Sequence, residues 1–228
     1  MSKKTWIIFI AICLALFGIL IFTSRSEKVD VSNINSNKAL AASEDSGNIA
    51  DHSFGKADSK VVLIEYGDFQ CPYCGRAYPG VKQMKETYKD KITFIFRNNP
   101  ITAIHPNAKS ASAAAEAAGL QGKFWEMHDQ LYEAQEAWSN QSTAERTTTF
   151  LGYAKAIGVK DIDKFKADMA GSAVSDKINF DLSLAKKAGV TGTPTFYLNG
   201  EKLSEDIADS ITNGDGAKFR AELDRELK

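Results

Sequence analysis

The sequence has few of the residues that build metal centres or disulfide frameworks. Its 228 residues include three cysteines and three histidines, and Cys71 and Cys74 form the only closely spaced cysteine pair. A structural zinc site needs four ligands, and neither a second C-x-x-C nor a paired-histidine spacing is present, so we expect no metal. Neither sign of charge dominates, because 28 Lys and Arg residues stand against 29 Asp and Glu residues, for a formal net charge of -1. That balance excludes a general electrostatic attraction to nucleic acid.

The 5 prolines and 16 glycines are no more than a globular protein ordinarily contains. Collagen-like and fully disordered chains are therefore excluded, and so is a disulfide-dense mini-protein. The hydrophobic share of 43% and the aromatic share of 10% are ordinary for a globular protein. The length beyond the N-terminal segment is best accounted for by one domain.

One long apolar run is present, at the N-terminus. Residues 6–22 are apolar without interruption and follow Lys3 and Lys4. As a helix, this run would extend roughly 26 Å, which is near the short end for a bilayer core. We therefore expect an uncleaved N-terminal transmembrane helix within 1–22, with the amino terminus in the cytoplasm and the remainder exported. A cleaved signal peptide is the alternative, although the nearest A-x-A site, at 39–41, is distant from the run.

Residues 23–57 differ in composition from the residues that follow them. They are rich in Ser, Asn, Ala and charged residues, and Phe54 is their one aromatic residue. This composition predicts a flexible linker that holds a domain, 58–228, away from the membrane.

From residue 58 onward, the pattern is that of a domain that mixes strands and helices. Short apolar runs with β-branched residues predict strands, apolar residues at helical spacing predict helices, and Asn-Gly predicts a hairpin turn. A crossover between parallel strands needs only one helix, so the long segment between the second and third strands is expected to hold an all-helical insert, about 105–188. The expected elements are strands at 61–66, 92–96, 195–198 and 201–203, a helix at 71–88 with a kink at Pro79, helices within 107–188, and a C-terminal helix with Phe219, Leu223 and Leu227 on one face.

The pair Cys71-Pro72-Tyr73-Cys74 follows a predicted strand and opens a predicted helix. At i, i+3 the two sulfurs lie on one helical face, within reach of a disulfide. Cys71 is at the helix N-terminus, where unpaired N–H groups and the helix dipole favour a thiolate that attacks and also leaves readily. Pro72 suits the first helical turn. These features predict a redox-active pair.

Three other roles for the pair are possible. A purely structural disulfide would close so small a ring that it contributes only about 2 kcal/mol, against nearly 5 kcal/mol for a loop of about 100 residues. A zinc site would need two further ligands. Two buried, unpaired cysteines are the third alternative.

Glu65 lies six residues before Cys71, on the strand that leads to it. Strand alternation places it on the same side as Leu63 and Gly67, so it can be a buried carboxylate under the C-x-x-C helix. Such a group would have a raised pKa and would relay a proton to or from Cys74. A solvent-exposed glutamate at the strand edge is an equally good interpretation of the residue pattern.

A second feature, Gly192-Thr193-Pro194-Thr195, comes just before a predicted strand. A cis Pro194 there would expose the backbone of Thr193 for pairing with an extended substrate. A trans proline on an edge strand is the alternative.

Together these motifs resemble the DsbA-like branch of the thioredoxin superfamily. The resemblance covers about 60–228 and implies an α/β thioredoxin fold interrupted by an all-helical subdomain. It implies that Cys71 is the attacking nucleophile, Cys74 the resolving thiol, Glu65 the buried acid, and Pro194 a cis proline facing the disulfide. The dipeptide Pro72-Tyr73 differs from the Pro-His of the best-known exported oxidase, in which the histidine helps to stabilise the thiolate. The resembling segments are 65–74, 105–108, 121–125, 127–129 and 192–195.

The resemblance and the export segment together predict a membrane-tethered, extracytoplasmic thiol-disulfide oxidoreductase that oxidises reduced, unfolded exported proteins. We expect Pro72, Tyr73 and Thr193 to contact substrate, a membrane quinone-linked partner to restore the disulfide, no organic cofactor, and a monomer. A reductase or isomerase is the alternative within the class, and a non-redox binding module for unfolded chains is the alternative outside it.

The remaining candidates are weak. His105 is expected to cap or pack the first helix of the insert, and Asp68 to stabilise a turn. His128, Phe124 and Trp125 are expected in the core of the insert, and Cys13 in the membrane.

Overall fold

The computed structural model describes residues 6, 9, 10, 12, 13 and 29–228. The chain divides into two units, Met1–Asp30 and Val31–Lys228. The five described residues between 6 and 13 are helical and exposed. Within the described part of the chain, no helix is both long and apolar enough to cross a bilayer. Most of the apolar run that predicts a transmembrane helix lies outside the described residues.

Within 31–228, five strands form one sheet in the order β1-β3-β2-β4-β5. Strands β2 and β3 are parallel, and the other neighbouring pairs are antiparallel. Asn199 and Gly200, with φ of 51° and 88°, connect β4 to β5, the conformation that a tight hairpin turn requires. The strands are β1 His52–Gly55, β2 Val62–Gly67, β3 Thr93–Asn98, β4 Thr195–Leu198 and β5 Glu201–Lys202.

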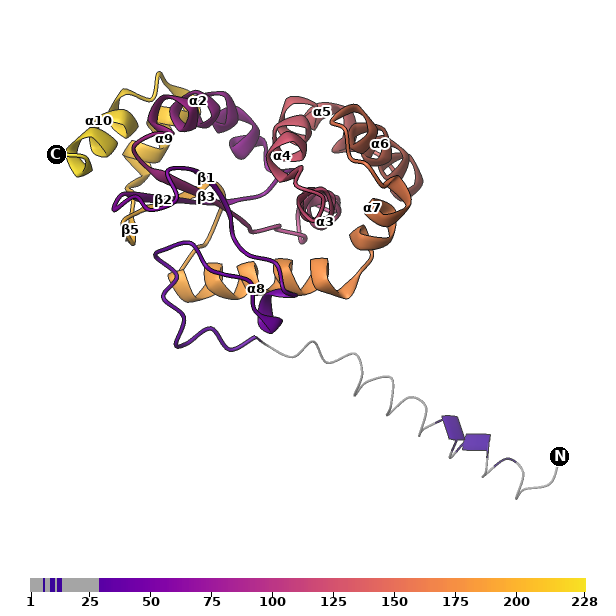
Figure 1. Ribbon diagram of the computed structural model, residues 1–228. Helices are drawn as coiled ribbons and strands as arrows, with labels where there is room; N and C mark the ends of the chain where they lie inside the picture. Colours follow the sequence, from indigo (N-terminus) through magenta and orange to yellow (C-terminus); the bar gives the residue numbers. More distant parts are fainter. Residues whose placement is uncertain (1–5, 7–8, 11, 14–28) are drawn as a thin grey trace. The chain divides into compact units, whose positions relative to one another are not determined.

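Helices cover both faces of this sheet (Figure 1). On one face, Leu63 of β2 belongs to a core shared with α2 (Pro72–Tyr88), α9 (Glu205–Asn213) and α10 (Ala217–Glu226). On the other face lies α8 (Ser172–Ala188), which connects to β4. Because side chains alternate along a strand, odd-numbered residues of β2 face α2 and even-numbered residues face α8. The predicted strands, C-x-x-C helix, hairpin and C-terminal helix are confirmed, whereas β1 and α9 have no counterpart among the expected elements.

The helical insert lies between β3 and α8. Its core contains a run of buried alanines on the first helix and buried aromatic residues such as Trp138 and Phe150. The helix α8 packs against β3 as well as against the insert, so it is the crossover helix of the sheet, and the expected insert boundary at 188 is too late. The insert helices are α3 Ala108–Gly119, α4 Phe124–Glu133, α5 Gln135–Trp138, α6 Thr143–Ala156 and α7 Ile162–Met169.

The expectation of a flexible linker over 23–57 is wrong for residues 31–57. This stretch holds a 3-10 turn, η1 (Glu44–Ser46), and then the edge strand β1, which pairs with β3. The guanidinium of Arg97 on β3 donates to the carbonyl oxygens of Ser36 at 2.6 Å and Lys38 at 3.0 Å. We call residues 31–51 the N-terminal strap. Its polar backbone is bound by side chains from elsewhere in the fold, an arrangement that leaves no apolar periodicity in the sequence.

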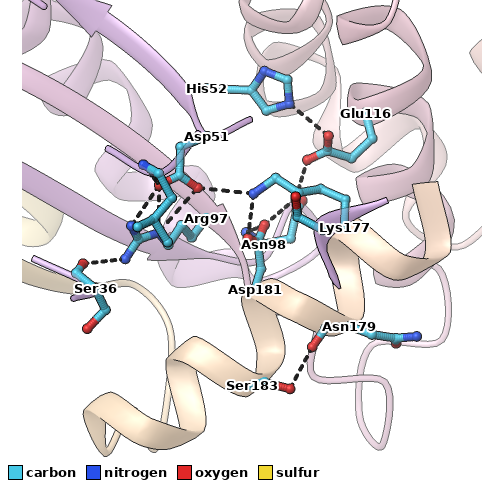
Figure 2. Close-up of polar contacts among 12 residues, drawn as sticks. Ser36, Asp51, His52, Arg97, Asn98, Glu116, Lys177, Asn179, Asp181 and Ser183 are labelled. Atoms are coloured by element: carbon cyan, nitrogen blue, oxygen red, sulfur yellow. Dashed lines mark hydrogen bonds and ion pairs between the residues drawn. The ribbon is translucent and has the colours of Figure 1, made fainter. Parts of the chain in front are cut away.

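A buried polar cluster joins the strap to the α8 face of the sheet (Figure 2). Asp51 of the strap accepts hydrogen bonds from Arg97 at 2.7 Å and from Lys177 of α8 at 3.1 Å. Lys177 also binds Asp181, at 2.6 Å. Burial raises the pKa of Asp51, but Lys177 and Arg97 outweigh it, so the pKa of this carboxyl lies below 3.8. The cluster therefore holds the strap by charge-assisted hydrogen bonds.

The same cluster reaches the insert. Asn98 on β3 donates to Asp181 at 3.1 Å and to Glu116 of α3 at 2.6 Å. Glu116 in turn binds His52 of β1, at 2.7 Å. Sheet, strap, crossover helix and insert are thus connected through one set of buried polar groups (Figure 2).

Candidate active site

Cys71 occupies the N-cap position of α2, and Pro72 is the first helical residue. Cys71 is 4% exposed, and Cys74, one turn later, is 1% exposed. Both are free thiols in this structure. The Cys71 thiol donates to the carbonyl oxygen of Thr193, with a sulfur–oxygen distance of 3.3 Å, and the Thr193-Pro194 peptide bond is cis. The structure therefore brings the two sequence motifs together and confirms the predicted cis proline.

The two cysteines differ strongly in acidity. A hydrogen bond from the Cys74 thiol is the largest cause that lowers the pKa of Cys71, which falls from 9.0 to about 5 although burial opposes the shift. Backbone N–H groups of Tyr73 and Cys74 contribute, as does the hydroxyl of Thr193. Conversely, burial raises the pKa of Cys74 well above 9.0. Near neutral pH, the pair is therefore one stabilised thiolate and one neutral thiol.

Glu65 is buried on the face of β2 that carries α2, as strand alternation predicts, with 3% of its surface exposed. Burial raises the pKa of Glu65 to about 8, and the positive charge of Lys85 opposes part of that shift. Lys85 is itself buried on α2 and is held by Asp129, with Nζ 3.2 Å from Oδ1. Glu65 is thus a carboxylic acid that keeps its proton at neutral pH in the interior beside the cysteine pair.

Two polar side chains that the sequence patterns did not single out support the loop before Cys71. Gln135 of the insert donates from Nε2 to the carbonyl oxygens of Phe69 at 2.7 Å and Cys71 at 2.9 Å. Gln70 accepts from the backbone N–H of Asn107 at 2.6 Å. A glutamine on a helix surface carries no pattern that indicates such a role, so only the tertiary structure reveals it.

Two of the weaker candidates, Asp68 and His105, support the loop that holds the active site. Asp68 is fully buried and accepts from the backbone N–H groups of Gln70 and Ile101, each at 2.8 Å, so its expected role in a turn is confirmed. His105 binds Asp68 through Nδ1 at 2.7 Å, whereas Asn107 occupies the N-cap of α3. The ring of His105 therefore supports the active-site loop, and of its two expected roles, capping or packing against the first insert helix, the capping role is wrong.

His128 and Phe124 are buried, as expected, and Trp125 is partly buried, but these side chains link the insert to the sheet. Phe124 stacks on His52 of β1 with ring centroids 3.6 Å apart, and Trp125 donates to the carbonyl oxygen of Ser53 at 3.1 Å. Burial lowers the pKa of His128 to about 4. His128 is therefore neutral, with Nδ1 3.0 Å from Asp129, and its buried Nε2 has no hydrogen-bond partner among the described residues.

A groove of about 1020 Å³ runs beside the cysteine pair, between the start of α2 and the insert. Tyr73 is exposed, and the guanidinium of Arg76 lies 4.3 Å from the centre of its ring. Ile104 at the groove is 68% exposed. The groove is lined by Gln70, Pro72, Gly75, Arg76, Ile104, His105, Tyr132, Glu133, Ala134, Gln135, Glu136, Ala137, Ser139 and Asn140. Among the described residues, no three His, Cys, Asp or Glu side chains cluster as metal ligands would.

Comparison with known proteins agrees with this geometry. The profile of a family described as Thioredoxin matches residues 47–212. A Na⁺/H⁺ antiporter NhaA 1 from Salinispora arenicola is 37% identical over 182 residues, which are 77% of this chain and 26% of that protein. This chain thus spans about a quarter of the length of that relative.

Solved structures share the fold. A thioredoxin-like oxidoreductase from Silicibacter pomeroyi is 26% identical, with a TM-score of 0.61 over 81% of this chain and 98% of that one. BdbD from Bacillus subtilis is 19% identical, with a TM-score of 0.66 over 83% of this chain and 98% of that one. The chain therefore belongs to the thioredoxin family.

Proposed function

We propose that this protein is a membrane-tethered, extracytoplasmic oxidase that introduces disulfides into exported proteins through Cys71 and Cys74. A substrate thiolate attacks Cys71 Sγ of the oxidised pair, a substrate–Cys71 disulfide forms, and Cys74 leaves. A second substrate thiolate then attacks the substrate sulfur, and Cys71 leaves as a thiolate. The substrate loses two electrons, and the cysteine pair gains them.

The observation that carries the oxidising direction is the acidity of Cys71. A thiol that ionises at about pH 5 rather than 9.0 stabilises the reduced pair, at pH 7 by about 3 kcal/mol. That stabilisation raises the reduction potential by about 60 mV relative to an unperturbed pair. A pair whose reduced form is stabilised gives its disulfide away. The Thr193 hydroxyl and the α2 N-terminus supply donors here, so the absence of histidine between the cysteines does not prevent thiolate stabilisation.

The exposed groups around Cys71 supply contacts for substrate. Pro72 and Tyr73 stand at the surface, and the groove continues from Pro72 along the insert. The backbone next to the cis Pro194 is in contact with Cys71, so an extended substrate segment pairing with Thr193 would bring its cysteine to the reactive sulfur.

The direct test is the reduction potential, measured on the full chain with Cys13→Ser so that Cys71 and Cys74 are the only thiols. The protein is equilibrated with glutathione buffers, and the reduced fraction is counted by thiol alkylation. We expect a value nearer about -120 mV than about -270 mV. A value near -270 mV would instead identify a reductase that needs an electron donor.

Cys71→Ser provides the test of mechanism, because it removes the attacking sulfur and should abolish oxidation of a reduced, unfolded substrate. A Cys71→Ser/Cys74→Ser variant separates catalysis from binding. If the double variant binds a cysteine-free unfolded polypeptide as well as the parent protein does, and the parent shows no oxidase activity, the protein is a binding module instead.

The membrane location rests on the apolar run 6–22 and the lysines before it. The relative named as an antiporter is consistent with it, since an antiporter exchanges ions across a membrane. Alkaline extraction of membranes should leave the full chain in the pellet, and protease added from the extracytoplasmic side should digest it. Release at high pH would exclude an anchor.

The reduced pair must be reoxidised for a second turnover, and we propose a membrane quinone-linked partner for that step. We also propose that the protein acts as a monomer. Catalytic turnover in membranes, lost on quinone depletion and restored by added quinone, would support the partner. Light scattering of the detergent-solubilised protein reports the oligomeric state.

A further inference from the structure

We propose that Tyr132, which the insert helix α4 supplies, takes part in the exchange reaction by donating a hydrogen bond to the Cys74 thiolate formed during turnover. This inference deepens the proposed function and rests on the chemistry of the cysteine pair. It assigns to the insert a chemical role in addition to its contribution to the groove.

The hydroxyl of Tyr132 lies over the end of β2, near Glu65, Cys71 and Cys74. A methyl group placed on Gly67 would be 3.1 Å from this hydroxyl. Gly67 is two residues after Glu65, and residues two apart point to the same face of a strand. The missing side chain of Gly67 leaves room for the ring of Phe96, and the Tyr132 hydroxyl lies beside that ring over the same face of β2 as Glu65.

Cys74 reaches the same place from α2. The backbone of Asp68, the residue after Gly67, lowers the pKa of the Cys74 thiol, so the sulfur lies near Asp68. The hydroxyl of Tyr132 and the sulfur of Cys74 thus approach two consecutive residues at the end of β2. Aromatic rings hold Tyr132 there, with Phe69 at 5.0 Å and Tyr78 at 5.3 Å between ring centroids.

The Tyr132 hydroxyl is buried and has no hydrogen-bond partner within the described protein. An unpaired buried hydroxyl is costly, and in native proteins such groups point to a function. Thr193, whose carbonyl oxygen accepts from Cys71, likewise has a buried hydroxyl with no hydrogen-bond partner among the described residues.

The charge on Cys74 arises in a defined step. When a substrate thiolate attacks Cys71, the bond between the two active-site sulfurs breaks, and its electron pair leaves on Cys74. The resulting thiolate is buried and must be stabilised until it takes up a proton, which Glu65 carries at neutral pH. A hydroxyl this close to the sulfur can turn its O–H toward the developing charge, and such a donor lowers the barrier to that step. In the reverse direction, Cys74 gives up its proton and attacks, and the same donor acts.

Tyr132→Phe removes this hydroxyl alone, and Tyr153→Phe is the matched control. Tyr153 lies on the insert helix α6, with its ring 6.3 Å from that of Phe150. Both variants are made in the full chain with Cys13→Ser. The titratable groups that face Tyr132 are Glu65, Asp68, Cys71 and Cys74, with His128 and Tyr78 against its ring.

The reaction of the reduced protein, in excess, with 5,5′-dithiobis(2-nitrobenzoate) separates the two cysteines. Cys71 attacks first and releases one nitrothiolate, and Cys74 then attacks the Cys71 mixed disulfide and releases the second. We expect Tyr132→Phe to leave the first phase unchanged and to slow the second at least tenfold, equivalent to about 1.4 kcal/mol. The pH at which the second phase is half-maximal should rise, because the Cys74 thiolate has lost a donor.

Stability distinguishes this role from a structural one. Removing an unpaired hydroxyl should leave the free energy of unfolding unchanged or raise it, so a slower second phase cannot be attributed to a loosened fold. A second phase with the rate and pH profile of Tyr153→Phe would overturn the proposal, whatever the stability. If the wild type shows both phases and the Tyr132 effect but oxidises no protein substrate, the proposed function fails while this inference stands.

Discussion

At Gly67, the sheet and the insert approach each other closely. A Cβ atom there would overlap the ring of Phe96, which is fully buried. We expect Gly67→Ala to lower the free energy of unfolding by about 1–3 kcal/mol, because the packed core cannot accommodate the added group without shifts. Chemical denaturation measures the change.

Gly152 provides the control for this substitution. It lies inside α6, and a Cβ atom there would meet nothing within 4 Å. Gly152→Ala should raise the free energy of unfolding by up to about 1 kcal/mol, since alanine favours the helix. Equal effects of the two alanine variants would show that the space above Gly67 is not needed.

The buried acid Glu65 should reduce stability as the pH rises. The carboxyl keeps its proton up to about pH 8 in the folded protein and ionises near pH 4.5 when unfolded. The unfolded state thus binds fewer protons between these values, so this group lowers stability by up to about 1.4 kcal/mol per pH unit from pH 4.5 to 8. We expect Glu65→Gln to be more stable than the wild type, by a margin that widens over this range and is constant above it.

Denaturation curves recorded from pH 4 to 9 measure that margin. The same variant should be slower in proton-coupled exchange, because glutamine cannot deliver a proton to Cys74. A stability difference that does not vary with pH would contradict a raised pKa for Glu65.

At the scale of elements, the attachment of α8 to the rest of the fold depends on the buried ammonium group of Lys177. Lys177 lies between Asp51 and Asp181, and the side chains of all three are at most 1% exposed. Lys177→Met leaves the buried carboxylate of Asp181 without a cationic partner and leaves Asp51 with Arg97 alone, which should lower the free energy of unfolding by about 3–5 kcal/mol. Thermal or chemical denaturation at pH 7 measures the loss.

Lys164→Met is the matched control on α7. Lys164 pairs with Asp168 at 2.7 Å, but its side chain is 52% exposed. Its removal should change stability by less than about 1 kcal/mol, because exposed ion pairs contribute little. Similar losses in both variants would show that the buried cluster is not what secures α8.

The elements that were predictable from sequence are those with a local signal. Strand β2 has its apolar run, α2 begins at Cys71-Pro72, and Asn199-Gly200 marks the hairpin, so each was located closely. The strap and β1 were missed because Arg97, about 60 positions along the chain, binds the strap's carbonyl groups. No pattern within residues 31–51 indicates a partner so distant in sequence.

The residues of the candidate site also divide into those with a local signal in the sequence and those without one. Cys71, Cys74, Glu65 and Pro194 stand in short motifs, and their approach in space could be expected. Tyr132 and Gln135 act through their placement by the insert, which depends on how α4 and α5 pack against β2 and α2. The resulting contacts follow from tertiary packing rather than from any spacing in the sequence.

For the whole molecule, the N-terminal boundary of the folded unit is at residue 31 rather than 58. Lys187 of α8 donates to the carbonyl oxygens of Val31, Ser32 and Ile34 at 2.7–2.9 Å, and Ile49 is buried. A chain that begins at Asp51 should therefore be less stable than one that begins at Val31, by at least about 2 kcal/mol from lost hydrogen bonds and burial. Denaturant titration of the two chains measures this, and equal midpoints with equal slopes would exclude a stabilising strap.

The position of Tyr132 affects whether the insert can be removed or exchanged without loss of the cysteine site. The insert is bonded to β1 through His52 and Trp125, it supports the backbone of Cys71 through Gln135, and it places a hydroxyl over Gly67. A minimal thioredoxin obtained by splicing out the insert would keep both cysteines and lose much of their surroundings. Insert and sheet are therefore not interchangeable modules, and chimaeras with related enzymes should work only when α4, α5 and the loop 67–71 are exchanged as one piece.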